Sequence, residues 1–288
     1  MSASREEIQR HYEQSGLLER IIAGLKTLGK DLGHLTHEDL APADEFHSHG
    51  RSATRSLAEL AEIPRGSRVL DVGSGLGGPA RFLAATYGCD VTGIDLTPEF
   101  SAVANELSRL TGLGDRTRFQ TGDALQLPFT ESQFDVVWTI QMQMNIQDKR
   151  RLYAGIVRVL KPGGLFVCQE ACAGNGEPID LPVPWATRPE HSHLVDAELL
   201  RSLVRDVGLR ERAWRDVTNE IVAARKAQQA KAQALGARGS GAFPPLGMHL
   251  VLGDQAAVKM ANSARTTDEG RVVFIQGVFD KPAPDRKS

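Results

Sequence analysis

A glycine-rich turn between a short apolar segment and an amphipathic one constrains this chain more than any other feature. Residues 69–78 read Val-Leu-Asp-Val-Gly-Ser-Gly-Leu-Gly-Gly, and an apolar-periodic stretch begins after Pro79. An apolar run broken by one acid is typical of a parallel strand that is buried on both faces. A strand, a glycine turn and a helix place bare backbone at a helix N-terminus, where a ligand can approach closely. The sequence therefore predicts a nucleotide-like cofactor at this turn.

The same glycines also fit a different class of enzyme. Gly73, Gly75 and Gly78 satisfy the G-x-G-x-x-G pattern, so a nicotinamide-dependent oxidoreductase is one interpretation. Asp71 argues against it, because a carboxylate beside the turn repels a pyrophosphate and holds an ammonium group or another donor. Asp95 ends a second predicted strand roughly 20 residues after Gly73, a spacing that suits a carboxylate bound to both ribose hydroxyls. These two acids favour a cofactor rich in hydrogen-bond donors.

Further motifs follow in order along the chain. Gly122-Asp123-Ala124 ends a third predicted strand, where an acid can accept a hydrogen bond from an exocyclic adenine amine. Phe134–Trp138 and Leu160–Gly164 come next. With the glycine turn and Gly93-Ile94-Asp95, these motifs resemble the class I S-adenosylmethionine-dependent methyltransferases over about residues 68–170.

Two segments, Gly78–Arg81 and Tyr87–Thr97, resemble the small-molecule branch of that superfamily. This branch includes the ubiquinone/menaquinone C-methyltransferases and the sarcosine/dimethylglycine and phosphoethanolamine N-methyltransferases. The resemblance implies S-adenosylmethionine as the cofactor and a small molecule as the methyl acceptor. Carried over onto this sequence, it implies cofactor contacts from Asp71, Gly73, Ser74, Gly75, Asp95, Leu96, Asp123, Ala124 and Gln141.

The alternation of strand-like and helix-like segments predicts an α/β fold with a parallel sheet. We expect a Rossmann-like, doubly wound sheet whose last strand, 271–279, is antiparallel as in the resembled family. Other strands are predicted near 68–72, 90–95, 117–121, 134–140, 164–170 and 209–217, and helices near 79–86, 98–111 and 148–160.

The segments outside this core are expected to cover the site. Residues 1–63 are predicted to form an N-terminal helical lid, in which 38–50 is a loop-like linker, and residues 64–288 the methyltransferase domain. Cap insertions are expected near 173–193, which is rich in Gly and Pro, and near 219–268. Residues 236–245, within the second insertion, have the composition of a hinge.

Composition narrows the partners and the compartment. A net charge of −2 over 288 residues argues against a nucleic-acid partner, which usually requires a basic surface. No run approaches the ~18 apolar residues of a membrane helix. Three cysteines are few and odd in number, so a reducing cytoplasm is expected. The sequence does not determine the oligomeric state, and a homodimer is one of the alternatives.

The acceptor side has no obvious general base after the fourth strand. Many relatives carry a histidine where Gln141 stands, and a glutamine forms hydrogen bonds but takes up no proton near neutral pH. Deprotonation would then fall to His47, to water or to desolvation of the acceptor. His47 is the candidate catalytic base, with a hydrogen bond within the loop as the competing interpretation. We therefore predict a nitrogen nucleophile as acceptor, with oxygen or activated carbon as runner-up.

Other candidate acceptor contacts are Met144, Glu170, Trp185 and His249, besides Gln141. Three of them have a structural alternative: core packing for Met144, a solvated strand end for Glu170 and an anchor for the insertion at Trp185. His249 is a weaker candidate, because it follows the predicted hinge. The two His-Ser-His pairs have no cysteine or carboxylate at metal-ligand spacing, so no metal site is expected. A methyltransferase-like protein that binds the cofactor without methyl transfer is the alternative from a different functional class.

Overall fold

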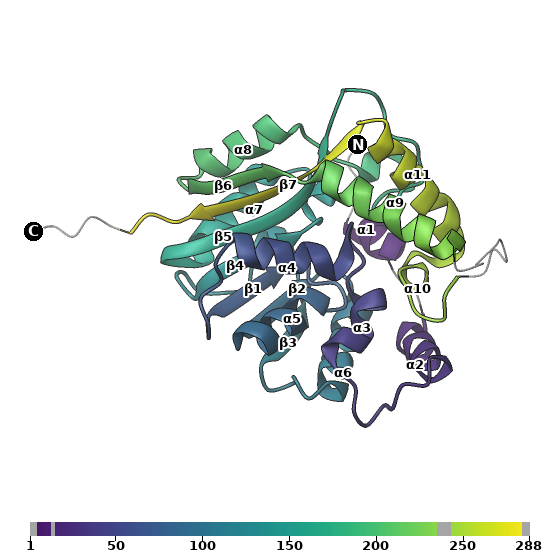
Figure 1. The fold of residues 1–288 in the computed structure, drawn as a ribbon. Helices are drawn as coiled ribbons and strands as arrows, with labels where there is room; N and C mark the ends of the chain where they lie inside the picture. The colour runs from purple at the N-terminus through teal and green to yellow at the C-terminus, as the bar shows by residue number, and fades with distance from the viewer. Residues whose placement is uncertain (1–4, 13–14, 235–242, 284–288) are drawn as a thin grey trace, which may run out of the picture.

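A computed structural model describes residues 5–12, 15–234 and 243–283 (Figure 1). At its centre is a seven-stranded sheet with the order β3-β2-β1-β4-β5-β7-β6. β7 runs antiparallel to both of its neighbours, β5 and β6, and the other pairs are parallel. The strands are β1 (Arg68–Val72), β2 (Asp90–Asp95), β3 (Thr117–Thr121), β4 (Phe134–Ile140), β5 (Leu160–Ala173), β6 (Arg210–Asp216) and β7 (Val272–Asp280). The predicted fold class, including the antiparallel last strand, is confirmed.

Helices cover both faces of the sheet. The alternating residues Val69 and Leu70 of β1 belong to two different apolar clusters, one on each face. One cluster packs against α4 (Gly50–Leu60), α5 (Gly78–Tyr87) and α6 (Pro98–Leu110), and the other against α7 (Lys149–Val159) and α8 (Ala197–Asp206). Burial on both faces explains why the strands read as nearly continuous apolar runs. It leaves the carboxyl edge of the sheet as the place for a ligand.

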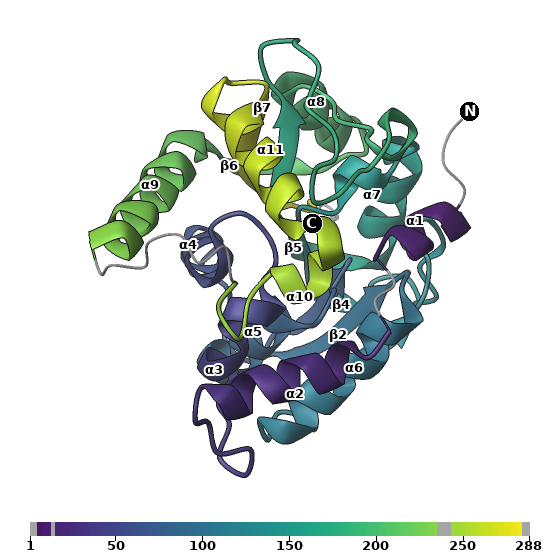
Figure 2. The same ribbon diagram turned by 90° about the vertical axis from the view of Figure 1, so that its right-hand side faces the viewer.

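The N-terminal segment contains α1 (Arg5–Tyr12), α2 (Leu17–Thr27) and α3 (His37–Asp44), followed by α4. α3 occupies most of the segment expected to be a loop-like linker, so that expectation was wrong there. The helix starts at a capping box, in which the backbone N–H of Thr36 donates to Asp39 Oδ2 at 2.9 Å. Figure 2 shows α2 alongside α6, and the two helices share an apolar cluster with α3. The division between a lid, 1–63, and a domain, 64–288, stays a prediction.

The two expected insertions lie together. Residues 174–196 form an irregular segment with one short 3₁₀ turn, Pro189–His191, and an apolar anchor at Val183. The second insertion contains α9 (Thr218–Ala234), α10 (His249–Leu252) and α11 (Ala256–Asp268). Val183 and Ile221 of α9 share one buried cluster, so the insertions pack on each other. Most of the predicted hinge, 236–245, lies outside the described residues.

Candidate active site

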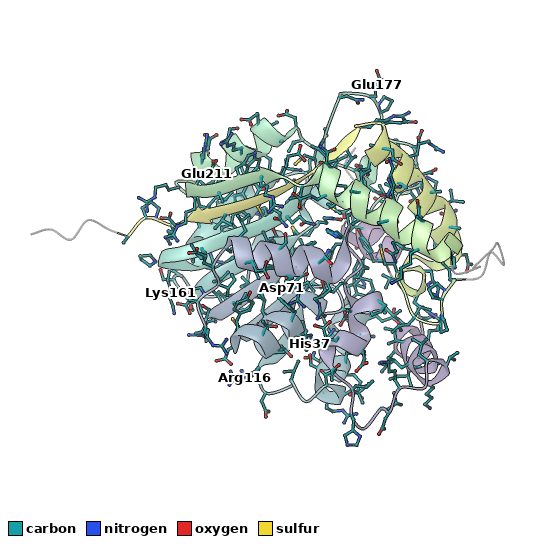
Figure 3. All side chains as sticks on the ribbon, in the orientation of Figure 1. His37, Asp71, Arg116, Lys161, Glu177 and Glu211 are labelled. Carbon is teal, nitrogen blue, oxygen red and sulfur yellow. The ribbon has the colours of Figure 1, made fainter. Side chains whose placement is uncertain are left out.

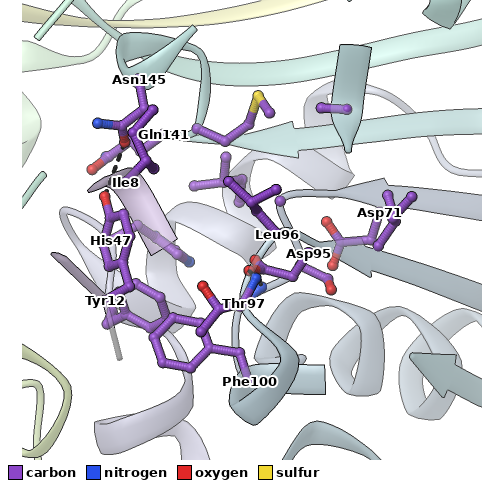
Figure 4. A pocket seen from close by; sticks show the side chains of 18 of the residues that line it. Ile8, Tyr12, His47, Asp71, Asp95, Leu96, Thr97, Phe100, Gln141 and Asn145 are labelled. Atoms are coloured by element: carbon purple, nitrogen blue, oxygen red, sulfur yellow. Dashed lines mark hydrogen bonds between the residues drawn. The ribbon is translucent and has the colours of Figure 1, made fainter. Parts of the chain in front are cut away.

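The predicted cofactor residues line one cavity at the carboxyl ends of β1 to β4. This cofactor cavity includes every residue of the set Asp71, Gly73, Ser74, Gly75, Asp95, Leu96, Asp123, Ala124 and Gln141. Figure 4 shows its opposite sides, with the carboxyl groups of Asp71 and Asp95 on one and the rings of Tyr12 and His47 on the other. Residues separated by more than 50 positions meet here because parallel strands bring their carboxyl ends to one edge.

The glycine turn is fixed to the neighbouring strand. The backbone N–H groups of Gly73 and Ser74 donate to the carbonyl oxygen of Ile94 at 2.8 and 3.1 Å. Gly73 and Gly75 have φ values of 77° and 50°, in the left-handed region that favours glycine. A Cβ on Gly75 would lie 2.7 Å from the ring of Phe46, which is closer than van der Waals contact permits. The turn is therefore packed so tightly that only glycine fits.

Two carboxyl groups in the cofactor cavity differ in how well they are satisfied. Asp95 accepts hydrogen bonds from the backbone N–H groups of Gly75 and Thr97, both at 2.9 Å, and burial raises the pKa of its carboxyl. Asp71 is 2 % exposed, and its Oδ2 has no hydrogen-bond partner. Burial, with the nearby charge of Asp95, raises the pKa of Asp71 to about 8. Figure 3 shows Asp71 inside the molecule, whereas Arg116 lies at its periphery.

These groups fit the cofactor that the sequence implies. A buried carboxyl oxygen without a partner costs free energy that a cationic or donor-bearing ligand would recover. The hydroxyl of Ser74 is buried without a partner in the same cavity. Together with the bare backbone of the glycine turn, Asp71 and Ser74 make a site for a ligand that brings its own donors, as S-adenosylmethionine does with its amino group.

A second cavity, the acceptor cavity, adjoins the first. The two share Tyr12, Phe46, His47 and Gln141. The volume of the acceptor cavity is about 530 Å³, within the range of small-molecule sites. Its lining includes three of the predicted acceptor contacts, Gln141, Met144 and Trp185. Apolar residues of α9 and α11 also line it, namely Ile221, Ala224, Met260 and Ala264.

Two predicted acceptor contacts lie elsewhere. Glu170 lines neither cavity: it is buried under the turn after β4 and accepts hydrogen bonds from Thr139 Oγ1 at 2.7 Å and the backbone N–H of Met142 at 3.2 Å. Burial raises the pKa of Glu170 to about 7. His249 also lines neither cavity, and its ring stacks on Phe243 with centroids 4.6 Å apart. The position of Glu170 supports a structural role in the turn, which differs from both interpretations made from the sequence.

Gln141 occupies the boundary between the cavities in a strained conformation. Its φ of 48° is in the left-handed region, which is unfavourable for a residue with a side chain. Its side-chain Oε1 accepts a hydrogen bond from the backbone N–H of Ser48 at 3.1 Å. Its Nε2 is buried without a partner. Such strain is typical of functional positions, and here it leaves one donor at the boundary unused.

His47 lies beside a buried carboxylate that sequence reasoning missed. Its Nε2 is 3.3 Å from Oε2 of Glu45, and its Nδ1 is buried without a hydrogen-bond partner. Arg51 donates from Nε to the other oxygen of Glu45. Burial alone would raise the pKa of Glu45, but His47 and Arg51 outweigh burial and hold it below its ordinary value. The available signal was the spacing in the sequence, since Glu45 is only two residues before His47.

The N-terminal helix contacts both cavities. The hydroxyl of Tyr12 donates to Oδ1 of Asn145 at 2.9 Å, the dashed line in Figure 4. The amide of Asn145 donates in turn to the carbonyl oxygens of Trp185 and His191, at 2.8 and 2.9 Å. Burial raises the pKa of Tyr12 well above its ordinary value, so the hydroxyl keeps its proton. The chain of hydrogen bonds joins α1, the turn after β4 and the first insertion.

Within the described ranges, no group of three or more His, Cys, Asp or Glu side chains is placed to hold a metal ion. None of the helices described there has the length and apolar character needed to cross a membrane.

Comparison with known proteins agrees with this geometry. A family model described as a methyltransferase domain matches residues 70–168. A probable tocopherol O-methyltransferase of Oryza sativa subsp. japonica is 36 % identical over 155 residues, which cover 50 % of this chain and 43 % of that protein. A glycine/sarcosine/dimethylglycine N-methyltransferase of Actinopolyspora halophila is 35 % identical over 138 residues, covering 48 % and 23 %. The chain therefore spans less than half of either relative.

Among solved structures, the [4+2]-cyclase SpnF superposes with a TM-score of 0.68 at 23 % identity, covering 98 % of both chains. At that identity, the likeness concerns the fold. The match of residues 70–168, the ordered motifs and the sheet topology agree with one another. The chain thus contains a methyltransferase domain at residues 70–168, and the resemblance to class I S-adenosylmethionine-dependent methyltransferases predicted from its motifs is confirmed.

Proposed function

We propose that this protein binds S-adenosylmethionine in the cofactor cavity and transfers its methyl group to a small molecule in the acceptor cavity. The observation that carries the proposal is the meeting of the two cavities at Tyr12, Phe46, His47 and Gln141. A donor in one cavity and a nucleophile in the other would face each other across this opening. Methyl transfer needs alignment and exclusion of water more than it needs an elaborate catalytic apparatus.

The residues of the cofactor cavity would bind and orient the donor. The cofactor itself supplies an activated methyl group on a sulfonium. Asp95 would accept from the ribose hydroxyls, Asp123 from the adenine amine and Asp71 from the ammonium group. The close packing of Phe46 on the glycine turn would keep water away from that end of the site.

The charge of the acceptor cavity favours an uncharged acceptor. Apart from histidines, the acidic and basic side chains in its described lining are Glu45 and Arg225, and each has a partner of opposite charge. Glu45 pairs with Arg51, and Arg225 pairs with Asp268 at 2.6 Å. Within that lining, a permanently cationic or phosphorylated acceptor would therefore meet no uncompensated charge. We propose a neutral nucleophile that carries a proton. The nitrogen expected from the sequence fits in its uncharged form, and a hydroxyl oxygen fits equally well.

His47 would take the proton that such an acceptor loses. Its Nδ1 is buried without a partner, and its side chain lines both cavities. General-base catalysis by a positioned histidine contributes roughly 10²–10⁴-fold to a rate. This role would supply the base that Gln141 cannot provide.

The test is transfer of a labelled methyl group from S-adenosylmethionine to a panel of neutral amines, hydroxyl compounds and activated carbon acids. Label in a low-molecular-weight product, with equal release of S-adenosylhomocysteine, is the expected result. Cofactor binding by calorimetry without labelled product from any acceptor class would favour the cofactor-binding alternative. Absence of cofactor binding, with binding of a nicotinamide dinucleotide instead, would favour the oxidoreductase.

Trp185 gives a sharper test of the acceptor cavity once an acceptor is found. The residue is 4 % exposed and lines the acceptor cavity but not the cofactor cavity. Trp185→Ala should raise KM for the acceptor by at least tenfold, since a buried aromatic contributes more than ~1.4 kcal/mol. Its affinity for S-adenosylmethionine should stay unchanged. Trp214→Ala on β6 is the matched control, because Trp214 lines neither cavity. Equal KM values for both variants would contradict the proposed acceptor site.

A further inference from the structure

The hydrogen-bond partners of His47 determine which of its ring nitrogens carries the proton. Nε2 lies 3.3 Å from Glu45 Oε2 and 3.4 Å from Thr54 Oγ1. Thr54 is fully buried, and its hydroxyl donates its one hydrogen to the same Oε2 of Glu45. Arg51 occupies Oε1 of that carboxylate.

Counting hydrogens leaves one arrangement of the neutral ring. An ionised carboxylate only accepts hydrogen bonds, and a hydroxyl that has donated its hydrogen elsewhere also only accepts. Both oxygens facing Nε2 therefore require a hydrogen on that nitrogen. In the neutral imidazole, the lone pair is then on Nδ1, which is buried and has no partner. The side chain that bears it lines the cofactor and acceptor cavities.

We infer that Glu45 is a positioning residue that fixes neutral His47 as the Nε2–H tautomer. Arg51 and Thr54 hold the Glu45 carboxylate in place. Nδ1 of His47 is then the proton acceptor at the opening between the cavities. The tautomer follows from the hydrogen-bond geometry alone, whereas its use in a reaction rests on the proposed function. No metal ion or further co-reactant is needed for this step.

The charge balance of the step explains why a carboxylate, that of Glu45, faces Nε2 of His47. As the acceptor's heteroatom forms its bond to the methyl group and the sulfur–methyl bond breaks, the heteroatom's proton moves to Nδ1. The positive charge that the sulfonium loses ends on an imidazolium whose Nε2–H faces the Glu45 carboxylate. A carboxylate at 3.3 Å stabilises that cation as it forms.

Other titratable groups near His47 do not replace this partner. His49, two residues on, has a pKa lowered chiefly by burial, with a smaller contribution from His47, and is neutral near pH 7. Tyr12 on α1 keeps its proton. Asp71 on β1 shares the cofactor cavity and is mostly protonated at pH 7, since its pKa is about 8. Glu45, with Arg51 behind it, is thus the carboxylate that directs the ring.

The tautomer can be read without any substrate. The full chain, labelled with ¹⁵N-histidine, is studied by long-range ¹H–¹⁵N correlation NMR at about pH 8.5, where unperturbed imidazoles are neutral. Loss of one signal set in His47→Ala assigns the residue. We expect His47 to show a protonated Nε2 and an unprotonated Nδ1.

Glu45→Gln should reverse this pattern. Arg51 should hold the amide oxygen of the new side chain, which turns its NH₂ group toward Thr54 and His47. Nε2 must then accept, so the proton moves to Nδ1. Glu38→Gln is the matched control: the same change in another acid beside Arg51, 3.2 Å away, should leave the tautomer unchanged. Thr54→Val should also keep the wild-type tautomer, because the carboxylate remains.

Activity measurements distinguish the assignment of the His47 tautomer from the use of that tautomer in proton transfer. With an acceptor that loses a proton, Glu45→Gln should lower kcat by about a hundredfold, and Glu38→Gln should not. A protonated Nδ1 in the wild-type protein, or an unchanged tautomer in Glu45→Gln, would overturn the inference even if methyl transfer is found. A reversed tautomer with unchanged kcat would instead overturn proton transfer to Nδ1. If no acceptor is ever methylated, the proposed function fails while the NMR result still stands.

Discussion

Binding of the cofactor should expel a proton from Asp71. The pKa of this carboxyl is raised to about 8 by burial and by Asp95, so at pH 7 about nine in ten molecules carry the proton. A ligand that places a cationic group beside the carboxyl requires the ionised form. Binding at pH 7 should therefore release about 0.9 proton. As pH increases toward 8, affinity should rise about tenfold per pH unit.

Asp71→Asn is the informative variant because the sign of its effect differs between the free and the bound protein. A carboxyl whose pKa is higher in the folded than in the unfolded state makes the folded state less stable as pH rises from about 4 to 8, by ~1.4 kcal/mol per unit. Removing it should stabilise the free protein at pH 8 by a few kcal/mol, after allowing for the buried amide. The same change should weaken cofactor binding.

Calorimetry with S-adenosylhomocysteine in two buffers of different ionisation enthalpy measures the proton release, and thermal unfolding measures the stability. The wild-type protein should release close to one proton and Asp71→Asn close to none. Equal proton release by both proteins would refute the argument, as would a variant that is less stable than the wild type at pH 8 but no less stable at pH 5.

Two further predictions concern the same cavity. Asp95→Ala should weaken S-adenosylmethionine binding about a hundredfold in calorimetry, since two hydrogen bonds to a charged group are worth roughly 3 kcal/mol, and unchanged affinity would contradict the ribose assignment. Gly75→Val should abolish cofactor binding in a folded protein, because its Cβ would lie 2.7 Å from Phe46. Gly88→Val is the control: φ is also positive there, at 67°, but nothing lies within 4 Å of the added Cβ, so binding by that variant should be normal.

The cofactor cavity could be predicted from the sequence because its chemistry is local to strand ends. Asp71 is the next-to-last residue of β1, Asp95 ends β2 and Asp123 follows β3, and a parallel sheet brings those positions to one edge. Only the order of the motifs along the chain was needed. The same logic failed for Glu170 at the end of the expected strand near 164–170. β5 continues to Ala173, so this acid is within the sheet and buried rather than at its edge.

The N-terminal segment was harder to predict because its helices depend on long-range packing. α3 contains Pro42 and only eight residues, so propensity alone favours a loop. Its stability comes from the capping box and from the burial of Leu40 in the apolar cluster that also contains residues of α2 and α6. The pairing of Asp44 with Arg81 of α5, both fully buried at 2.8 Å, is a further contact that sequence spacing does not reveal.

The acceptor cavity differs from the cofactor cavity in the segments that form its walls. This difference explains why the acceptor is harder to identify from the sequence than the cofactor. Most of its described lining comes from the segment 41–52, the first insertion, α9 and α11, which lie outside the sheet, and Phe274 of β7 is the residue that a strand contributes. These segments are joined by individual contacts, such as the hydrogen bond of Asn262 to the carbonyl oxygen of Pro182 at 3.0 Å. Changes in such contacts alter the shape of the cavity without disturbing the strand ends that hold the cofactor. One cofactor site can therefore serve relatives named for O- and N-methylation, while the acceptor must be identified through residues such as Trp185 and His47.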